Sequence, residues 1–380
     1  MNSQKRQRVV CGMSGGVDSS ATAALLLEQG FEVICITLKL WPQDCVNRAE
    51  DKCCGPQAVT DARSVCDKLG VPYYLIDEAA EFQKHVIQYF ADEYKAGRTP
   101  NPCVMCNQNL KFGRLIDRAD QLGADFIATG HFARIEKIVG QASSLSDSKN
   151  QNDRQDACPT TRYLLKRGRD LRKDQSYFLF SLRQDQLARA IFPLGEKTKS
   201  DTREVARHCN LKTADKEESM EICFVPDNNY GGFLQQAKLV QKHRGEIVDT
   251  RGQILGQHDG IEFYTIGQRK GLGITTPKPV YVVELDTENN RVVVGDESAL
   301  DRDEFVATNC NWIPFVKLTE PIQVTVKIRY NHPGTTATIT PLENNSVRVK
   351  LHSLQRAITP GQAAVFYQDD LVVGGGWIAR

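Results

Sequence analysis

The chain has 380 residues, 41% of them hydrophobic and 25% charged, and its 48 Lys and Arg nearly balance its 47 Asp and Glu. These values are typical of a soluble globular protein, and at roughly 150 residues per domain they predict two or three domains. The 28 Gly and 15 Pro are ordinary numbers, which excludes a collagenous or wholly disordered chain, and no apolar run approaches the roughly 18 residues that span a bilayer. The balanced charge argues against binding nucleic acid by bulk charge but leaves room for a local basic face.

The N-terminus carries no recognisable secretory leader, because the apolar run Val9-Val10-Cys11 is too short for one. We therefore expect a soluble, cytoplasmic protein with no membrane partner. Twelve cysteines without a leader are better explained as reduced thiols, metal ligands or catalytic groups than as a disulfide scaffold.

The first third of the chain alternates short apolar runs with segments of helical spacing. Strands are predicted at residues 8–13, 31–40, 73–76 and 126–129, and helices at 19–29, 56–69, 82–94 and 110–122. Strands separated by helices of this length predict an α/β, Rossmann-like domain, with a parallel sheet covered by helices on both faces.

Residues 139–161 break this pattern. The segment is polar and nearly devoid of apolar groups, which predicts a disordered surface insertion in which Cys158 is incidental. The next stretch, 162–173, is strongly basic, with Lys or Arg at six positions and Asp170 as its one acidic residue. A solvated charged face or a nucleic-acid contact would each explain it. Helical spacing resumes at 176–182, 184–191 and 202–210.

Beyond about residue 245 the apolar residues recur with a period of two. The segments 280–285 and 291–294 flank Asp-Thr-Glu-Asn-Asn, which predicts a hairpin. Further strands are predicted at 322–330, 335–341, 346–351 and 363–367. Repeated short strands with turn residues between them predict a small antiparallel β-barrel.

A glycine-rich loop lies between the first predicted strand and helix. Its sequence is Gly12-Met13-Ser14-Gly15-Gly16-Val17-Asp18-Ser19-Ser20. Such a loop turns several backbone N–H groups and a helix N-terminus toward one point, which favours phosphate or pyrophosphate binding. It lacks the Gly-Lys-Ser/Thr ending of a Walker A loop and the dinucleotide fingerprint. An ordinary turn with Asp18 or Ser19 as N-cap is the alternative.

Three cysteines form the second candidate site. Cys103 and Cys106 follow the turn-rich segment 97–102, which predicts a surface loop, and Cys223 comes much later in the chain. The spacing fits half of a zinc site, a redox pair, part of an iron–sulfur ligand set, or two unrelated buried thiols. Cys53 and Cys54 are adjacent and read as structural. The cysteines in apolar periodic segments read as core residues: Cys11, Cys35, Cys66, Cys209 and Cys310.

Taken together, the motifs closely resemble the tRNA-specific 2-thiouridylases, tRNA uridine 2-sulfurtransferases with the PP-loop of the ATP pyrophosphatases. The motifs that carry the resemblance, in order, are Gly12–Ser19, Gly97–Pro102 with Cys106-Asn107, Lys111-Phe112-Gly113, Ala128–His131, Lys173–Tyr177, Ile222–Val225, Tyr264–Leu272, Arg329-Tyr330 and Pro360-Gly361-Gln362. The resemblance runs from about residue 8 to residue 380, interrupted by the polar insertion.

The resemblance implies three domains and an ATP-dependent reaction. They are a PP-loop catalytic domain at 1–215, a small central domain at 216–280 that carries Cys223, and a C-terminal β-barrel at 281–380 that contributes to tRNA binding. Members convert the wobble uridine of tRNAs for Lys, Glu and Gln to 2-thiouridine by adenylating its C2 oxygen. The nucleotide-binding residues implied are Gly12, Met13, Ser14, Gly15, Gly16, Val17, Asp18, Ser19, Leu38 and Gly130. We further expect Mg²⁺ on the phosphates, a sulfur donor (a cysteine desulfurase or a sulfur-relay protein) and a monomer.

The resemblance also assigns roles to the cysteines, with one departure. Cys223 would receive sulfur as a persulfide, and Cys106 would be the partner nucleophile. Many members carry Asp near the target base where this chain has Cys103, and a thiol cannot replace that charge unless its pKa is strongly lowered. Cys103, Cys106 and Cys223 would instead suit a [4Fe–4S] cluster with an open iron. Both sulfur routes stay open at this point.

Residues matching the family's tRNA contacts complete the set. They are Asn101, Pro102, Cys103, His131, Lys173, Asp174, Gln175, Arg329, Tyr330 and Gln362. Two other functions remain to be tested: a PP-loop ligase acting on a small molecule, and a nucleic-acid-binding or iron-carrying protein with a degenerate ATP loop.

Overall fold

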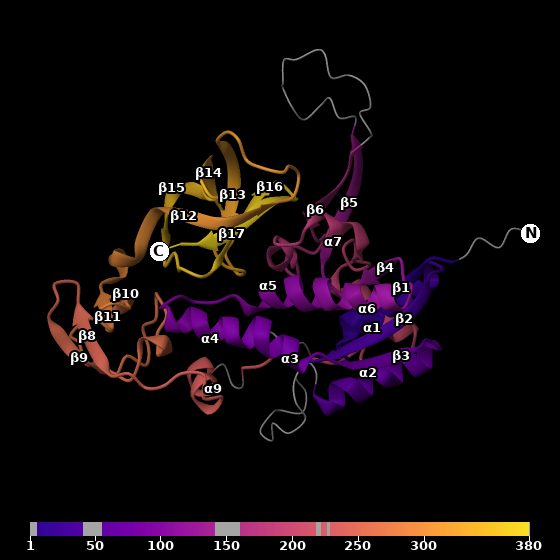
Figure 1. Cartoon of the computed structure of the whole chain (residues 1–380), viewed down its shortest axis with the longest axis horizontal. Helices are drawn as coiled ribbons and strands as arrows, with labels where there is room; N and C mark the ends of the chain where they lie inside the picture. The colour runs from indigo at the N-terminus through magenta and orange to yellow at the C-terminus, as the bar shows by residue number, and fades with distance from the viewer. Residues whose placement is uncertain (1–5, 41–54, 141–159, 218–221, 226–228, 380) are drawn as a thin grey trace, which may run out of the picture.

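A computed structural model describes residues 6–40, 55–140, 160–217, 222–225 and 229–379. These residues form a five-stranded parallel sheet, a four-stranded mixed sheet and an eight-stranded antiparallel sheet (Figure 1). Cys53, Cys54, Cys158 and all but the ends of the predicted insertion fall outside the described residues. Within the described part of the chain, no helix has the length and apolar character needed to cross a membrane.

The parallel sheet confirms the predicted α/β class. Its strands, in sheet order, are β3 (Tyr73–Asp77), β2 (Glu32–Lys39), β1 (Arg8–Gly12), β4 (Phe126–Ala128) and β7 (Ala190–Ile191). Side chains of β1 alternate between two clusters, with Val10 in one and Val9 and Cys11 in the other. Because successive strand residues point to opposite faces, this division shows that β1 is buried on both sides.

Helices pack around this sheet and extend from it. They are α1 (Val17–Glu28), α2 (Pro56–Leu69), α3 (Ala79–Phe82), α4 (Gln88–Lys95), α6 (Leu115–Gln121), α7 (Gln184–Arg189) and α8 (Lys199–His208). A π-helical segment, Gln83–Ile87, joins α3 to α4, and a 3₁₀ turn covers Ser176–Leu179.

The prediction of a surface loop around Cys103 and Cys106 is wrong. This region is α5 (Pro102–Cys106), which continues through a π-helical segment, Asn107–Arg114, into α6. The turn residues before it end at the helix start, where Pro102 takes a position that needs no backbone N–H donor. Figure 1 shows α4 and α5 running between the parallel sheet and the C-terminal half of the molecule.

The central sheet contains β10 (Tyr281–Asp286), β11 (Arg291–Gly295), β8 (Gly245–Asp249) and β9 (Ile254–His258), in that order, and α9 (Tyr230–Gln236) precedes it. The predicted hairpin is confirmed as the antiparallel pair β10–β11, but β11 pairs with β8 rather than with the barrel. A domain boundary at 280/281 would split this sheet, so we propose the boundary between β11 and β12.

The antiparallel barrel at the C-terminus is confirmed. It consists of β12 (Asp301–Trp312), β15 (Val347–Arg356), β14 (Thr335–Pro341), β13 (Ile322–Lys327), β16 (Ala363–Gln368) and β17 (Leu371–Ile378), and the pairing of β17 with β12 closes it. A hairpin that was not predicted, β5 (Ala133–Gly140) with β6 (Thr160–Arg167), extends the sheet through the pairing of Leu371 with Lys166. Part of the basic run therefore lies on a strand.

Candidate active site

A pocket of about 370 Å³ lies where β1 ends and α1 begins. It is lined by every residue of Gly12–Ser19 and by Leu38 and Gly130, so the structure brings together all ten nucleotide-binding residues named from the sequence. His131 and Gln175, which were grouped with the tRNA contacts, also line it. Lys111, Lys216 and Glu217 line it too and were not expected.

The loop itself depends on two glycines. Gly15 has a φ of 71°, and a Cβ there would lie 2.1 Å from the carbonyl oxygen of Ala58. Across the pocket, a Cβ on Gly130 would lie 2.9 Å from the Cβ of Asp18. The N-cap of α1 is Gly16, which has no side chain to cap the first turn. The N–H groups of that turn can therefore serve phosphate oxygens.

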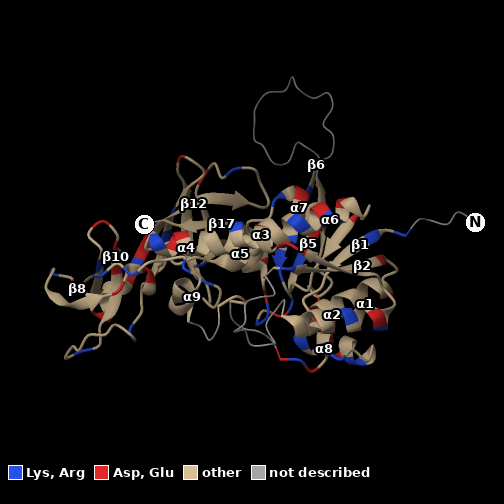
Figure 2. Cartoon of the chain, turned by 60° about the horizontal axis from the view of Figure 1, so that its bottom comes forward, with Lys and Arg blue, Asp and Glu red and all other residues tan. Residues whose placement is uncertain are grey.

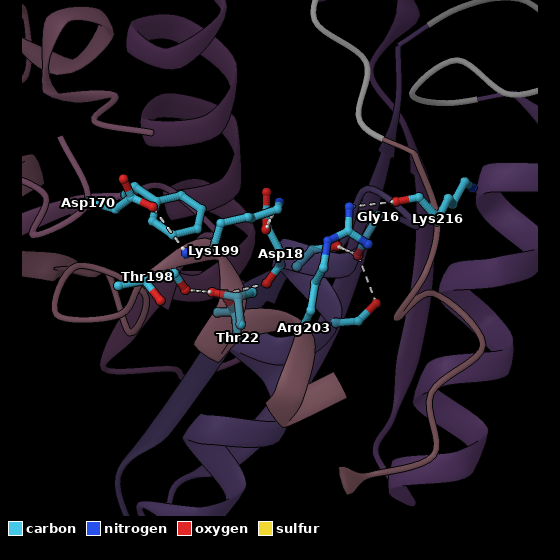
Figure 3. A network of polar contacts seen from close by, with 12 residues as sticks. Gly16, Asp18, Thr22, Asp170, Thr198, Lys199, Arg203 and Lys216 are labelled. Atoms are coloured by element: carbon cyan, nitrogen blue, oxygen red, sulfur yellow. Dashed lines mark hydrogen bonds and ion pairs between the residues drawn. The ribbon is translucent and has the colours of Figure 1, made fainter. Parts of the chain in front are cut away.

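Asp18 is paired with a lysine from a distant helix. The Nζ atom of Lys199, on α8, donates to Oδ1 of Asp18 at 2.5 Å, and only 12% of the lysine side chain is exposed (Figure 3). The backbone N–H of Lys199 donates to Oδ2 of the buried Asp170 at 3.2 Å. The positive charge of Lys199 offsets the negative charge of the Asp18 carboxylate. Without it, the carboxylate would repel an anion at this helix N-terminus.

A second lysine joins the loop to α2. Lys216 Nζ donates to the carbonyl oxygen of Gly15 at 3.2 Å and to Oδ2 of Asp61 at 2.5 Å. Arg203, also on α8, donates to the carbonyl oxygens of Ala214 at 2.7 Å and Lys216 at 3.3 Å. Thus α8 contacts both the glycine-rich loop and the start of the segment that leads toward Cys223 (Figure 3).

His131 is buried and neutral in this site. Its Nδ1 shares a hydrogen bond of 2.7 Å with the Thr129 hydroxyl, and its ring lies 5.9 Å from the ring of Phe112. Burial lowers the pKa of His131 well below its ordinary value, and the charge of Lys111 acts in the same direction. A neutral imidazole at physiological pH suits binding rather than the delivery of a proton.

Cys106 and Cys223 meet in one apolar cluster. Cys106 is a buried member and Cys223 packs against its edge. Leu40 belongs to the same cluster and also lines the nucleotide pocket, and Leu38 lines the pocket and packs against the cluster. The pocket and the two thiols therefore share a wall.

Cys103 lies one helical turn before Cys106 on α5. Burial raises the pKa of the Cys103 thiol, and Lys111 opposes that rise. Cys103 is thus a neutral thiol at pH 7, without the negative charge of a carboxylate. No group of three or more His, Cys, Asp or Glu side chains is placed to hold a metal ion within the described residues, which include Cys103, Cys106 and Cys223. The ligand set of the iron–sulfur route, one of the two sulfur routes left open by the sequence, is therefore not preformed among the described residues.

The segment Lys173–Gln175 is anchored internally. The carboxylate of Asp174 is buried and accepts the backbone N–H groups of Gly168 at 3.1 Å and Ser176 at 3.0 Å. Gln175 accepts the N–H of Phe132 through Oε1 at 3.1 Å, next to His131. Asp174 therefore shapes this turn, while Gln175 faces the pocket.

The remaining residues named for tRNA surround α5 and the turn that follows Gln175. Asn101 and Pro102 are buried at the start of α5. Tyr330 packs on Phe178, with ring centroids 4.5 Å apart, and the neighbouring Arg329 is exposed. The basic run is partly used in folding, because the Arg167 guanidinium lies 3.9 Å from the centre of the Tyr367 ring. Figure 2 shows basic and acidic residues interspersed over the elements rather than separated.

Comparison with known proteins identifies the family. Residues 7–227 match the family described as "tRNA methyl transferase HUP domain", 232–296 match "tRNA methyl transferase PRC-barrel domain" and 302–378 match "Aminomethyltransferase beta-barrel domain". The chain is 46% identical over 376 residues to tRNA-specific 2-thiouridylase MnmA 1 of Clostridium botulinum (99% of this chain, 100% of the relative). The protein belongs to the tRNA-specific 2-thiouridylase family.

A second relative agrees. The chain is 48% identical over 376 residues to tRNA-specific 2-thiouridylase MnmA 1 of Caldanaerobacter subterraneus, covering 98% of each chain. Among solved structures, a 4-thiouridine synthetase–RNA complex with bound ATP has a TM-score of 0.36 and 17% identity over 61% of this chain and 51% of that chain, values at which the likeness supports no conclusion.

The sequence analysis of this 2-thiouridylase family member did not predict two of the lysines that contact the glycine-rich loop and the start of α1. Lys199 and Lys216 are separated from Asp18 and Gly15 by about two hundred residues, and no local pattern marks them. Lys111 had a usable signal, because it lies in the quoted motif Lys111-Phe112-Gly113, but that motif was given no role.

Proposed function

We propose that the protein is an ATP-dependent tRNA uridine 2-sulfurtransferase that converts the wobble uridine of tRNAs for Lys, Glu and Gln to 2-thiouridine. The observation that carries the proposal is the shared wall of Leu38 and Leu40, because these residues lie both in the pocket of the glycine-rich loop and in or against the apolar cluster to which Cys106 belongs and against which Cys223 packs. Nucleotide activation and sulfur transfer need such neighbouring sites, because the first modifies the oxygen of the C2 carbonyl group and the second adds sulfur to its carbon.

The first step activates the base. The uridine C2 oxygen attacks the α-phosphorus of ATP, the bond to the β-phosphate breaks, and pyrophosphate leaves. The Gly12–Ser19 loop and the N-terminus of α1, which no side chain caps, would hold the phosphates. Mg²⁺ would arrive with the nucleotide, since such ions keep several waters and bind through phosphates and one or two carboxylates. Asp18 and Glu217 both line the pocket, and Asp18, at the N-terminus of α1, is the carboxylate that we propose would face the ion.

The second step delivers sulfur. A persulfide on Cys223, charged by a donor protein that itself carries a persulfide, is attacked by the Cys106 thiolate at the inner sulfur. A Cys106–Cys223 disulfide forms and hydrosulfide leaves, which adds to C2 and expels AMP. An external thiol then reduces the disulfide. This route needs no metal and uses the two thiols that pack in or against the same apolar cluster.

The tRNA would approach α5 from the side of the barrel. His131, Lys173, Gln175, Arg329 and Tyr330 are the residues we propose as contacts, with Asn101, Pro102 and Cys103 closest to the target base. Single-stranded anticodon bases are recognised by splaying them into pockets beside aromatic and cationic side chains. The exposed Arg329 beside the half-buried Tyr330 offers such a surface.

The test is a thiolation assay on unmodified tRNA, scored by nucleoside mass spectrometry. Anaerobically purified, iron-replete protein is compared with iron-stripped protein, each given ATP, a sulfur donor and a thiol. Cys106→Ser and Cys223→Ser are expected to abolish the product while ATP binding persists, and Cys103→Ser, which exchanges one neutral group for another, is expected to retain activity.

Four outcomes would contradict the scheme. Activity only with iron, together with loss of activity in Cys103→Ser, would replace the persulfide route with a cluster. Retained turnover in Cys106→Ser or Cys223→Ser would remove that thiol from the mechanism. Pyrophosphate release that does not depend on tRNA would favour a small-molecule ligase. Addition of a methyl group in place of the oxygen-to-sulfur exchange would favour the reaction named in the family descriptions.

A further inference from the structure

Gln362 was expected to contact tRNA, but its side chain binds the segment that leads into α5. Its Nε2 donates to the carbonyl oxygens of Thr99 at 3.1 Å and Pro100 at 3.0 Å. The backbone adds a third bond, from the N–H of Thr99 to the carbonyl oxygen of Pro360 at 2.8 Å. These bonds join the barrel to the residues directly before Asn101 and Cys103.

Two glycines allow this segment to pack closely against both the central sheet and the barrel. Gly361 has a φ of 87°, and a Cβ there would lie 2.9 Å from the Cβ of Arg98 and from the carbonyl oxygen of Thr99. Gly97 has a φ of 65°, and a Cβ there would lie 2.8 Å from Cγ2 of Thr287, just after β10. Because neither position has room for a side chain, residues 97–101 are closely docked on both sides.

The same stretch of the barrel also holds the opposite side of the site. The Tyr177 hydroxyl donates to the carbonyl oxygen of Ala363 at 2.9 Å, and Tyr177 is fully buried two residues after Gln175. Burial raises the pKa of Tyr177, and a hydrogen bond with Asn101 acts against that rise. Residues 360–363 therefore fix both the entry to α5 and the turn that reaches the nucleotide pocket.

The stretch is itself anchored. The N–H of Gly361 donates to the carbonyl oxygen of Ile378, and the N–H of Ile378 donates to that of Gln362, both at 2.9 Å. Strand β17, which closes the barrel, thus supports the docked segment. A change at Gln362 would act on α5 through a rigid frame.

We propose that Gln362 is a positioning residue. Its amide holds the carbonyls of Thr99 and Pro100 so that α5 presents Cys106 at a fixed place, and docking of the barrel on residues 97–101 sets that place. The catalytic part of this inference rests on the proposed function. A tRNA contact and a positioning role differ in their kinetics, because the first alters KM for tRNA and the second alters kcat.

Three variants test the proposal. Gln362→Met keeps the size of the side chain and removes both donors, and Gln362→Lys restores a donor. Gln368→Met is the matched control, since Gln368 lies on β16 of the same barrel and donates its amide to the carbonyl oxygen of Gln323 on β13 at 3.2 Å, and not to the segment before α5. Steady-state thiolation gives kcat and KM for tRNA. Hydrogen exchange of residues 97–106 in the free protein reports docking without catalysis.

Gln362→Met is expected to lower kcat by about 10- to 100-fold, in line with the effect of small misplacements of reacting groups, with KM for tRNA unchanged. Exchange at 97–106 should become faster while exchange in β1 stays the same. Gln362→Lys should recover much of kcat, and Gln368→Met should match the wild type. A raised KM with unchanged kcat and unchanged exchange would overturn the proposal. If the wild type makes no thiolated product, the proposed function fails, and unchanged exchange in Gln362→Met would separately refute the docking role.

Discussion

Replacing Gly15 by Ala tests whether the pocket depends on the shape of its loop. A side chain at a φ of 71° costs about 1–2 kcal/mol in the left-handed region. The new Cβ would also lie 2.1 Å from the carbonyl oxygen of Ala58, on the backbone of α2, so one of the two must move. Such overpacking costs typically about 1–3 kcal/mol. The expected loss of stability in the parallel-sheet domain is therefore about 2–5 kcal/mol.

Gly30→Ala is the matched control. Gly30 follows α1, the helix that Gly15 precedes. It has a φ of 85°, and a Cβ there would have no atom within 4 Å. It should cost about 1–2 kcal/mol from the backbone alone. The difference between the two variants isolates the collision with Ala58, and it should be about 1–3 kcal/mol.

Two measurements check this reasoning. Hydrogen exchange of the β1 and β2 amides in urea gives the opening free energy of the sheet. Calorimetry gives ATP affinity, which should fall at least about tenfold in Gly15→Ala, equivalent to about 1.4 kcal/mol, and stay unchanged in Gly30→Ala. Equal stability of the two variants together with wild-type ATP affinity in Gly15→Ala would refute the role assigned to the loop geometry.

Three further predictions follow from the structure. Lys199→Met should leave the Asp18 carboxylate without this cation and weaken ATP binding by about tenfold, whereas Lys199→Arg should retain most of the affinity. Calorimetry measures the ATP affinity of both variants, and unchanged affinity in Lys199→Met would remove Lys199 from the site. Burial depresses the pKa of His131, so above pH 6.5 the residue is neutral in the folded and the unfolded protein, and the free energy of unfolding decreases as the pH falls from there toward the depressed value. His131→Asn should flatten the slope of the unfolding free energy against pH by up to about 1.4 kcal/mol per pH unit in urea titrations. An unchanged slope would contradict the neutral imidazole. Gly140 pairs with Thr160 at the end of the β5–β6 hairpin, so replacing residues 141–158 by a short turn should preserve thiolation; a large loss would give the insertion a role in the reaction.

Local patterns predicted the elements whose apolar spacing is undisturbed. The helix predicted at 56–69 matches α2 residue for residue, since Pro56 opens it and Gly70 ends it in the left-handed conformation. The patterns failed where polar or turn residues mask an element. Helix α5 was missed because its first residue is a proline after a run of turn residues, and β6 because Lys166 and Arg167 on it suggested a charged face. Contacts such as that of Lys199 with Asp18 join segments that are distant in sequence. The spacing of apolar residues within either segment does not predict such contacts.

Resemblance and structure contribute different kinds of information about the same residues. Resemblance placed Asp174 and Gln362 among the tRNA contacts, and the structure shows the Asp174 carboxylate and the Gln362 amide nitrogen bound to backbone groups of the protein itself. Buried polar groups need partners, and removing one partner leaves the other unsatisfied at a cost of about 1–3 kcal/mol. A loss of thiolation after mutation of either residue can therefore have two causes, a distorted site or a lost contact to tRNA. For Gln362 the ratio of kcat to KM effects decides between these causes, because a distorted α5 slows the reaction of bound tRNA while a lost contact weakens its binding.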